Sequence, residues 1–276
     1  MIKSLLQGTL RRLGLYDWFK DKTFAYDVYS YFKEGRPLDW RAREVRFFRS
    51  LVGGGKGPFL IFDVGANCGK KTDVFLKLGA HVVAVDPDDA NLRILSRKYG
   101  RRFRKRPVTI IGKAVSDSER TETLWITSPG DGLNTLSGKW VRALKANPGK
   151  FGVPVEFPGR QDVETTTLAS LMQSHGIPHY IKIDVEGHEA PVLRGLPHPV
   201  PAVSFEVNLP EFGPEASECV EILGHLSPNG QFNLTSCDTY RGFTLNAWKT
   251  GAEIIPILGT LGETTVEIYW KCDPRI

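Results

Sequence analysis

Three side chains that are able to accept a proton lie close together in the segment 181–189 (IKIDVEGHE): Asp184, Glu186 and His188. A histidine titrates near neutral pH, so His188 is the best-matched catalytic base, and Glu186 would orient its ring or accept the proton itself. The segment has a structural alternative, because acids are favoured at helix N-termini and a helix is expected to begin near Gly187. We therefore predict an acid–base site here, with helix capping as the alternative.

The same segment contains too few ligands to predict a metal site. A zinc-binding H-E-x-x-H helix needs a second histidine, and here that position is Val192. The segment also lacks the consecutive prolines and the aromatic side chain that would stack a flipped base. We expect no metal ion and no nucleic-acid partner. Glu206, in the segment 202–207, is a further site candidate, and a buried, hydrogen-bonded acid is its alternative.

A glycine-rich turn forms a second candidate site. The apolar run 59–63 ends in Asp63 and is followed by Gly65, Asn67 and Gly69 (DVGANCG). These glycines allow a sharp bend and a close approach of a ligand to the backbone. A dinucleotide-binding fingerprint would need glycine at positions 67 and 70, and the P-loop pattern is absent from this turn as well.

Asp86 adds a prediction about the ligand. It lies 21 residues beyond Gly65, after the apolar run 81–85, where a carboxylate can accept hydrogen bonds from both hydroxyls of a ribose. A nucleoside ligand without a pyrophosphate satisfies both features, and S-adenosylmethionine is the obvious one. An ordinary turn between a strand and a helix is the alternative.

The elements that must position these side chains alternate along residues 58–276. Short apolar runs predict strands, and apolar residues at helical spacing recur between them. This alternation predicts an α/β fold with a doubly wound, mostly parallel sheet, in which ligands bind at the carboxyl ends of the strands. The runs expected to form strands are 59–63, 81–85, 108–111, 180–184, 202–207, 231–235 and 265–270.

Five ordered motifs between residues 59 and 210 resemble the FkbM family of S-adenosylmethionine-dependent methyltransferases. They are DVGANCGKKT, VVAVDPD, AVSD at 114–117, VETTTLASL at 163–171 and IKIDVEGHE. The resemblance implies a class I methyltransferase fold, which is Rossmann-like and ends in an antiparallel hairpin. It also implies S-adenosylmethionine as the cofactor and O-methylation of a hydroxyl on a sugar, a glycan or a sugar-bearing metabolite.

The resemblance further implies roles for individual residues. The chain departs from the family pattern at Ala169, where an acid is common, and at Pro191, which is expected to tilt the helix after the IDVEG turn. Neither departure touches the cofactor motifs. The implied cofactor-binding residues are Asp63, Gly65, Asn67 and Gly69 at the methionine end, Asp86 at the ribose, and Ser116 or Asp117 at the adenine edge.

Composition excludes several classes of protein. With 276 residues, of which 41% are hydrophobic and 24% charged, the chain can bury a sizeable core and is not intrinsically disordered. It has no apolar run of the roughly 18 residues that a membrane-spanning helix needs, and Arg11 and Arg12 interrupt any signal-peptide core. Four cysteines without a CxxC pair indicate reduced thiols, so we expect a cytoplasmic protein.

Positive charge is concentrated in two segments, although the net charge is only +5. Residues 1–50 contain eleven Lys and Arg against six Asp and Glu. Together with the apolar spacing there, this predicts that residues 1–52 form a helical extension before the turn-rich break at 53–58. The extension would pack on the domain, cover a cleft or rest on a membrane.

The second basic segment, residues 97–106, contains seven bases and no acid. Arg97 and Lys98 are expected to complement the dipole of the helix that they close. The bases beyond them suggest an anionic acceptor, or a peripheral contact with the inner face of a membrane near which such an acceptor is built. A solvated face is the alternative.

Two other functions stay open from the sequence. An NAD(P)-dependent oxidoreductase would use a similar fold, but the missing glycines weigh against it. A non-catalytic binding module would retain the fold without turnover, and the intact glycine-rich turn and DVEGHE segment argue against such a loss.

Overall fold

The computed structural model describes residues 40–52, 59–100, 107–148, 150, 154–236 and 242–273. Most of the predicted N-terminal extension (1–39), the turn-rich break (53–58) and the bases at 101–106 lie outside the described residues. None of the described helices combines the length and the hydrophobicity that crossing a bilayer requires.

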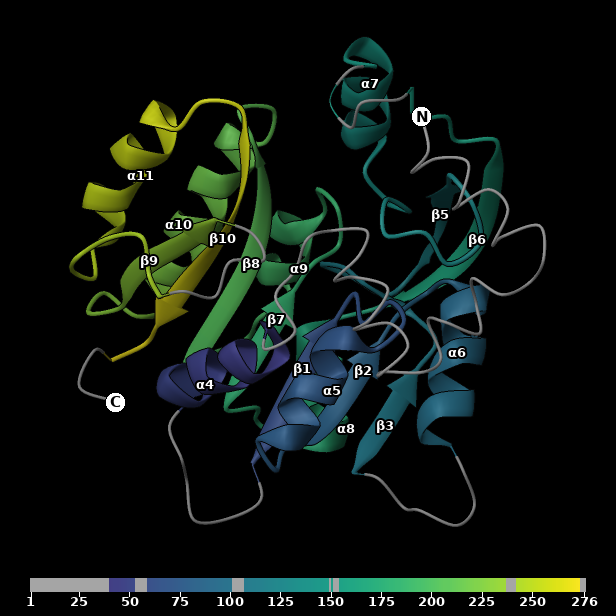
Figure 1. The fold of residues 1–276 in the computed structure, drawn as a ribbon, viewed down its shortest axis with the longest axis horizontal. Coiled ribbons are helices and arrows are strands. Elements are labelled where there is room, and N and C mark those ends of the chain that lie inside the picture. The colour runs from purple at the N-terminus through teal and green to yellow at the C-terminus, as the bar shows by residue number, and fades with distance from the viewer. Residues whose placement is uncertain are drawn as a thin grey trace.

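A seven-stranded sheet forms the centre of the molecule (Figure 1). Its strands are parallel except β10, which runs antiparallel to both β8 and β9. This arrangement confirms the predicted class I methyltransferase fold with a final antiparallel hairpin. In spatial order the strands are β3 (Val108–Ile111), β2 (His81–Val85), β1 (Leu60–Val64), β7 (Tyr180–Ile183), β8 (Ala202–Leu209), β10 (Thr264–Lys271) and β9 (Gln231–Ser236).

The strand order reverses at β1, and this reversal brings the predicted sites together. Val64 is in register with Val85 of β2 on one side and with Ile183 of β7 on the other. The turns that follow these three strands therefore leave the sheet at one edge, as expected for a ligand site at a switch in strand order. Asp86 and Asp184 each begin one of the two flanking turns.

Helices cover both faces of the sheet (Figure 1). Residues of α4 and α5 pack around Ile61 on one face, and residues of α8 to α11 pack around Phe62 on the other. Because successive strand residues point to opposite faces, the apolar strands serve both layers. The helices are α4 (Trp40–Val52), α5 (Lys70–Lys77), α6 (Asp89–Tyr99), α7 (Gly138–Ala146), α8 (Leu168–His175), α9 (Glu189–Arg194), α10 (Gly213–Leu226) and α11 (Gly251–Thr260).

A second, three-stranded sheet lies beside the first and was not predicted from the sequence. Its order is β4 (Ala114–Val115), β6 (Gly159–Thr166) and β5 (Thr121–Ile126), with β6 parallel to β4 and antiparallel to β5. It is tied to the turn after β2 by a hydrogen bond from Gln161 Nε2 to the carbonyl of Pro87, 3.1 Å long. The small sheet therefore adjoins the edge at which the predicted cofactor residues lie.

Helix α4 is the described part of the predicted N-terminal extension, and it is packed into the domain. The ring of Phe48 is fully buried and makes an edge-to-face contact with Phe75 of α5, with ring centroids 5.2 Å apart. Phe48 also contacts Tyr180 of β7 at 5.7 Å between centroids. Such aromatic pairs stabilise a core beyond the area that they bury. This helix therefore belongs to the packed core.

We predict that Phe48→Ala lowers the free energy of unfolding by about 3–5 kcal/mol, because it removes a buried ring and leaves a cavity. Urea denaturation measures this loss. Arg49→Ala on the exposed side of the same helix is the control, with an expected change within about 0.5 kcal/mol. Equal, small effects of both substitutions would mean that α4 does not contribute to the folded core.

Candidate cofactor site and active site

The glycine-rich turn after β1 has the backbone conformation that its sequence suggests. Gly65, Asn67 and Gly69 all have positive φ, at 80°, 48° and 77°. A Cβ atom on Gly65 would overlap the carbonyl oxygen of Asp184, so only glycine allows the turn to lie against the strand-end backbone of β7. The turn is thus held close to the neighbouring turn that carries the predicted catalytic residues.

Asp86 begins the turn after β2, and it accepts hydrogen bonds from that turn and from the glycine-rich turn after β1. Its Oδ2 accepts a hydrogen bond of 2.7 Å from Asn67 N, and its Oδ1 accepts from Asp88 N at 2.9 Å and from Asn91 Nδ2 at 3.1 Å. Burial raises the pKa of Asp86 to about 6, although these donors lower it. A carboxylate offers about four acceptor positions, so these three bonds leave acceptor capacity for a ribose hydroxyl.

Asp63 lies in β1, just before the glycine-rich turn, and not in the turn itself. The side chain is buried, and its Oδ2 accepts a hydrogen bond of 2.5 Å from Thr72 Oγ1 in α5. Burial raises the pKa of Asp63 to about 6, and the Thr72 bond opposes this rise. Asp63 therefore connects β1 to the helix that follows the glycine-rich turn. Its implied role at the methionine end of the cofactor stays a prediction.

The segment 128–135 connects the turn after β2 with the turn that carries Glu186. No role was predicted for it from the sequence. Asp88 Oδ2 accepts hydrogen bonds from Gly130 N (2.8 Å) and from Asn134 Nδ2 (2.7 Å). At the other end, Thr135 Oγ1 donates to the carbonyl of Glu186, 2.8 Å away. The segment therefore spans from the predicted ribose side to the predicted acid–base turn. Such a cross-connection leaves no local sequence signal.

The acid–base turn is held in an uncommon backbone conformation. Glu186 has a φ of 54°, and Gly187 follows with a φ of 90°. The carboxylate of Glu189 stabilises the turn by accepting hydrogen bonds from Val185 N (3.2 Å) and Gly187 N (3.1 Å). Glu189 is buried, and burial raises its pKa to about 7, although the donors oppose the rise. Glu189 is not among the residues predicted from the sequence, although its place in the first turn of α9 could have indicated its role.

Three carboxylates meet beside the end of β7, two from the turn that follows it and one from within β8. Oxygen atoms of Asp184, Glu186 and Glu206 all lie within 4.8 Å of one another. Burial, followed by the charges of Asp184 and Glu206, raises the pKa of Glu186 well above its usual range. The spacing is short enough for a shared cation, but the prediction that no metal is bound stays a prediction.

A buried lysine lies next to these carboxylates. Lys182 Nζ is 3.4 Å from Asp184 Oδ2 and 3.7 Å from Glu267 Oε1, and the side chain is only 1% exposed. Burial alone would lower the pKa of Lys182, but Asp184 and Glu267 raise it well above its usual range. Its ammonium group therefore stays charged and offsets part of the negative charge. A lysine inside an apolar strand (YIKI) is the sequence feature that could have indicated this buried charge.

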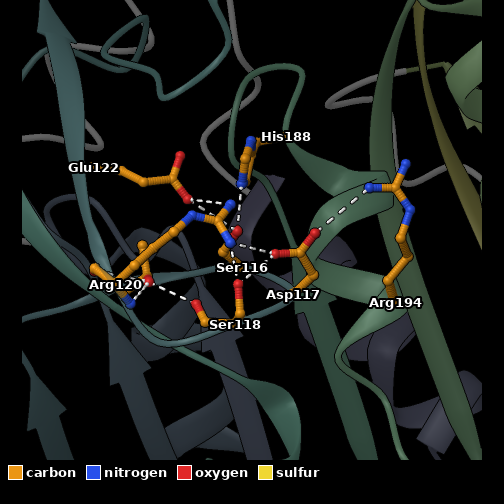
Figure 2. A network of polar contacts seen from close by, with 8 residues as sticks. Ser116, Asp117, Ser118, Arg120, Glu122, His188 and Arg194 are labelled. Atoms are coloured by element: carbon orange, nitrogen blue, oxygen red, sulfur yellow. Dashed lines mark hydrogen bonds and ion pairs between the residues drawn. The ribbon is translucent and has the colours of Figure 1, made fainter.

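His188 points to a different set of residues (Figure 2). Its Nε2 lies 3.0 Å from Ser116 Oγ, and Ser116 Oγ donates to Glu122 Oε1 at 3.3 Å. His188 is 8% exposed, and burial lowers its pKa, although Glu122 and Asp117 oppose this. The structure thus places His188 with Ser116 after β4, whereas Asp184 and Glu186 lie with Glu206.

Asp117 lies on the outer side of the same network (Figure 2). Its carboxylate accepts a hydrogen bond of 2.8 Å from Arg120 and is 3.7 Å from Arg194 of α9. The hydrogen bond from Arg120 lowers the pKa of Asp117. Asp117 is therefore a surface ion-pair partner in this structure, and the adenine-edge role implied for Ser116 or Asp117 stays a prediction.

The predicted cofactor residues fit a nucleoside. Asn91 is 2% exposed and donates to Asp86, but its Oδ1 has no hydrogen-bond partner among the described residues. Buried oxygens without a partner are uncommon in folded proteins, so this edge has hydrogen-bonding capacity that the described part of the chain does not use. Asp86, Asn91 and the backbone of the glycine-rich turn would together hold the ribose and methionine parts of S-adenosylmethionine.

Comparison with known proteins identifies the family. The methyltransferase FkbM domain matches residues 63–235, which is more than half of the chain. The chain belongs to the FkbM methyltransferase family. Membership of this family supports S-adenosylmethionine as the cofactor, as the motifs indicated, and the oxidoreductase alternative loses its basis. Comparison with curated proteins by sequence finds no match.

Solved structures with a similar fold are distant in sequence. A SAM-dependent methyltransferase from Agrobacterium tumefaciens is 8% identical (TM-score 0.42), and the alignment covers 85% of this chain and 62% of that one. A TehB-like methyltransferase from Corynebacterium glutamicum is 9% identical (TM-score 0.43; 91% and 97% covered). An O-methyltransferase from Bacillus cereus is 10% identical (TM-score 0.41; 86% and 81% covered). The chain spans less than two thirds of the first of these proteins.

We predict that Asp86→Ala weakens the binding of S-adenosylhomocysteine roughly ten- to a hundredfold, since hydrogen bonds to a charged group contribute about 1.5–3 kcal/mol. Calorimetry measures the change, with exposed Asp89→Ala in the same turn as the control. In the wild-type FkbM-family protein, affinity should also fall as the pH drops below about 6, where Asp86 gains a proton. Unchanged affinity in Asp86→Ala would contradict this assignment.

A separate prediction concerns pH and stability. The pKa of Glu189 is about 7 in the folded state, above its ordinary 4.5, so the folded state binds this proton more tightly. Its contribution to stability therefore declines as pH rises from 4.5 to 7. Glu189→Gln keeps an acceptor for the turn but cannot titrate.

Urea denaturation at several pH values tests this effect as a difference between two proteins. The unfolding free energy of the wild type minus that of Glu189→Gln should fall over this pH range by on the order of 1–3 kcal/mol. Subtracting the variant cancels Asp63 and Asp86, which act in the same direction, and His188, which acts in the opposite one. A difference that does not vary with pH would show that Glu189 does not titrate in this range.

Proposed function

We propose that this FkbM-family protein is an O-methyltransferase that methylates a hydroxyl of a sugar, a glycan or a sugar-bearing metabolite. The observation that carries the proposal is the group of carboxylates Asp184, Glu186 and Glu206 at the edge of the cofactor site. A hydroxyl acceptor must lose a proton during transfer, whereas thioether acceptors need no base. Closely spaced carboxylates next to the cofactor turn are suited to accept that proton.

Glu186 is the base that this arrangement favours. Its carboxylate is partly buried, and burial together with the neighbouring acids raises its pKa well above the usual range, which makes it a stronger proton acceptor than an ordinary carboxylate. Asp184 and Glu206 repel its negative charge, so protonation of Glu186 relieves that repulsion. Lys182 offsets the charge of Asp184, which allows the carboxylates to remain together without a proton on each.

Hydrogen bonds to the backbone hold the turn that carries Glu186 in place. Thr135 holds the carbonyl of Glu186, and Glu189 holds the N–H groups on either side. The acceptor oxygen must lie in line with the methyl group and close to the base, and such positioning alone supplies much of the rate. S-adenosylmethionine supplies the electrophilic methyl group when it is bound.

His188 is the second candidate base, and it is the one that the sequence favoured. Burial lowers its pKa, so the ring is neutral and able to accept a proton at pH 7. Its contact with Ser116 Oγ directs one ring nitrogen away from the three carboxylates. We therefore infer a positioning role for His188, in which it attaches the turn to the small sheet.

We expect the product to carry an additional 14 Da, the mass of a methylene group. The test is a mass spectrum of a candidate glycan pool after incubation with the protein and the cofactor. Fragmentation that locates the methyl group on an oxygen would support the proposal, and location on nitrogen or carbon would overturn it. A consistent absence of turnover would favour a non-catalytic module. An anionic acceptor and a peripheral membrane contact stay predictions, since residues 101–106 lie outside the described residues.

We predict that Glu186→Gln lowers kcat by about 10²–10⁴-fold with little change in cofactor affinity, because it removes the base but keeps the shape of the side chain. Steady-state kinetics and calorimetry measure the two quantities. Exposed Glu119→Gln is the matched control and should behave as the wild type. His188→Asn should retain most of kcat. A larger loss in His188→Asn than in Glu186→Gln would restore His188 as the base.

A further inference from the structure

The end of helix α6 turns two polar side chains inward, onto the glycine-rich turn. Arg97, Lys98 and Tyr99 form this last helical turn within the basic segment 97–106. Arg97 is exposed, as expected for a base that only complements the helix dipole. Lys98 and Tyr99 are not, since the Lys98 side chain is 7% exposed and Tyr99 is 5% exposed. The dipole therefore does not account for these two residues.

The ammonium group of Lys98 has a full set of acceptors. Its Nζ lies 2.6 Å from Asp73 Oδ2 and 3.3 Å from each of the carbonyl oxygens of Cys68 and Gly69. A lysine has three N–H donors, so each has an acceptor here. Two of the three acceptors are backbone atoms of the glycine-rich turn, and the third is in the first turn of α5.

Tyr99 makes a parallel set of contacts. Its hydroxyl lies 2.8 Å from the carbonyl oxygen of Gly69 and 2.9 Å from Asp73 Oδ1, and it donates to these two acceptors. Burial, followed by the charge of Asp73, raises the pKa of Tyr99, so the hydroxyl keeps its proton. A Cβ atom on Gly69 would lie 2.5 Å from this oxygen, which places the phenol directly against the turn.

These contacts fix the orientation of the peptide between Gly69 and Lys70. In a planar trans peptide the C=O and N–H groups point in opposite directions. The carbonyl of Gly69 accepts a hydrogen bond from Asp73 N within α5, and the donors from α6 hold it in the same orientation, so the N–H of Lys70 points the other way. Lys70 begins α5, and N–H groups at the start of a helix are suited to anionic groups of a ligand.

We propose that Lys98 and Tyr99 are positioning residues of the cofactor site, which hold the glycine-rich turn in its binding conformation before the cofactor arrives. A buried ion pair such as Lys98–Asp73 gains little stability once the cost of desolvation is included, so its geometric role is the larger one. Without this support the glycine-rich turn would also occupy conformations that do not bind the cofactor. The apparent affinity for the cofactor then falls in proportion to the fraction of molecules in the binding conformation. The proposal rests on the cofactor alone and not on the acceptor.

The test measures the binding of S-adenosylhomocysteine by calorimetry and the melting temperature of each variant. Tyr99→Phe keeps the ring and removes only the hydroxyl, and we expect its Kd to rise roughly tenfold. Its control is Tyr180→Phe, which also removes a buried tyrosine hydroxyl, one bonded to Ser204 Oγ in the sheet. Tyr180→Phe should lower the melting temperature to a similar extent with an unchanged Kd.

Lys98→Gln and Arg97→Gln form a second matched pair. Both remove one positive charge from the last turn of α6, but only Lys98 contacts the carbonyls of Cys68 and Gly69. We expect Lys98→Gln to raise the Kd by roughly tenfold or more and Arg97→Gln to leave it unchanged. If both lysine and arginine variants weaken binding equally, the effect is one of general charge and the proposal fails.

Kinetics supply an independent readout once an acceptor is known. Cofactor binding at saturation restores the turn, so the KM for S-adenosylmethionine should rise in Tyr99→Phe while kcat stays near the wild-type value. A wild-type Kd in both Tyr99→Phe and Lys98→Gln would overturn the proposal, as would an equal rise in Kd in Tyr180→Phe. Because the Kd is measured without an acceptor, failure of the O-methylation proposal would leave this result intact.

Discussion

The backbone of Gly65 lies directly against the carbonyl of Asp184, and the spacing of both candidate sites depends on that contact. Val64 and Ile183 pair in adjacent parallel strands, so the chain segments that follow them leave the sheet side by side. A side chain at position 65 would separate the segments by overlapping the carbonyl of Asp184. Its absence keeps the turn that would bind the cofactor within reach of the turn that carries Glu186. The proposed O-methylation needs such closeness, because the base and the methyl group would act on the same acceptor oxygen.

Buried acids lie near this contact, and hydrogen-bond donors beside each acid stabilise its charged form. Asp86 accepts hydrogen bonds from two N–H groups and one amide, and Glu189 accepts from two N–H groups. Burial still raises the pKa of both groups, so part of the desolvation cost remains in the folded protein. At a pH above these values, Asp86 and Glu189 therefore favour the folded state less than acids with unshifted pKa values would. Functional sites commonly retain such a cost, because the groups that favour folding most are seldom those that bind a ligand.

The sequence predicted those parts of the site that lie at the ends of adjacent strands. Asp86 and Asp184 were found because strand ends next to β1 must share one edge. The partner of His188 was not found, because Ser116 is 72 residues away and lies beside a two-residue strand, β4, which has no periodicity to detect. The inward orientation of Lys98 was missed for another reason. Its place in the last helical turn already had a local explanation in the helix dipole, although Lys98 lies three residues after the buried Leu95 and therefore on the same face of α6.

The left-handed conformation of the acid–base turn explains why three proton acceptors within five residues do not lie in one group. Asp184 continues the direction of β7, and positive φ at Glu186 and Gly187 then reverses the chain. His188 emerges after this reversal and meets Ser116, whereas Glu186 lies with Asp184 and Glu206. One short turn therefore serves two regions: its carboxylates lie at the edge shared with the cofactor turn, and its imidazole is attached to the small sheet. Asp184, Glu186 and His188 are close together in the sequence, but the positive φ at Glu186 and Gly187 separates His188 from the two carboxylates.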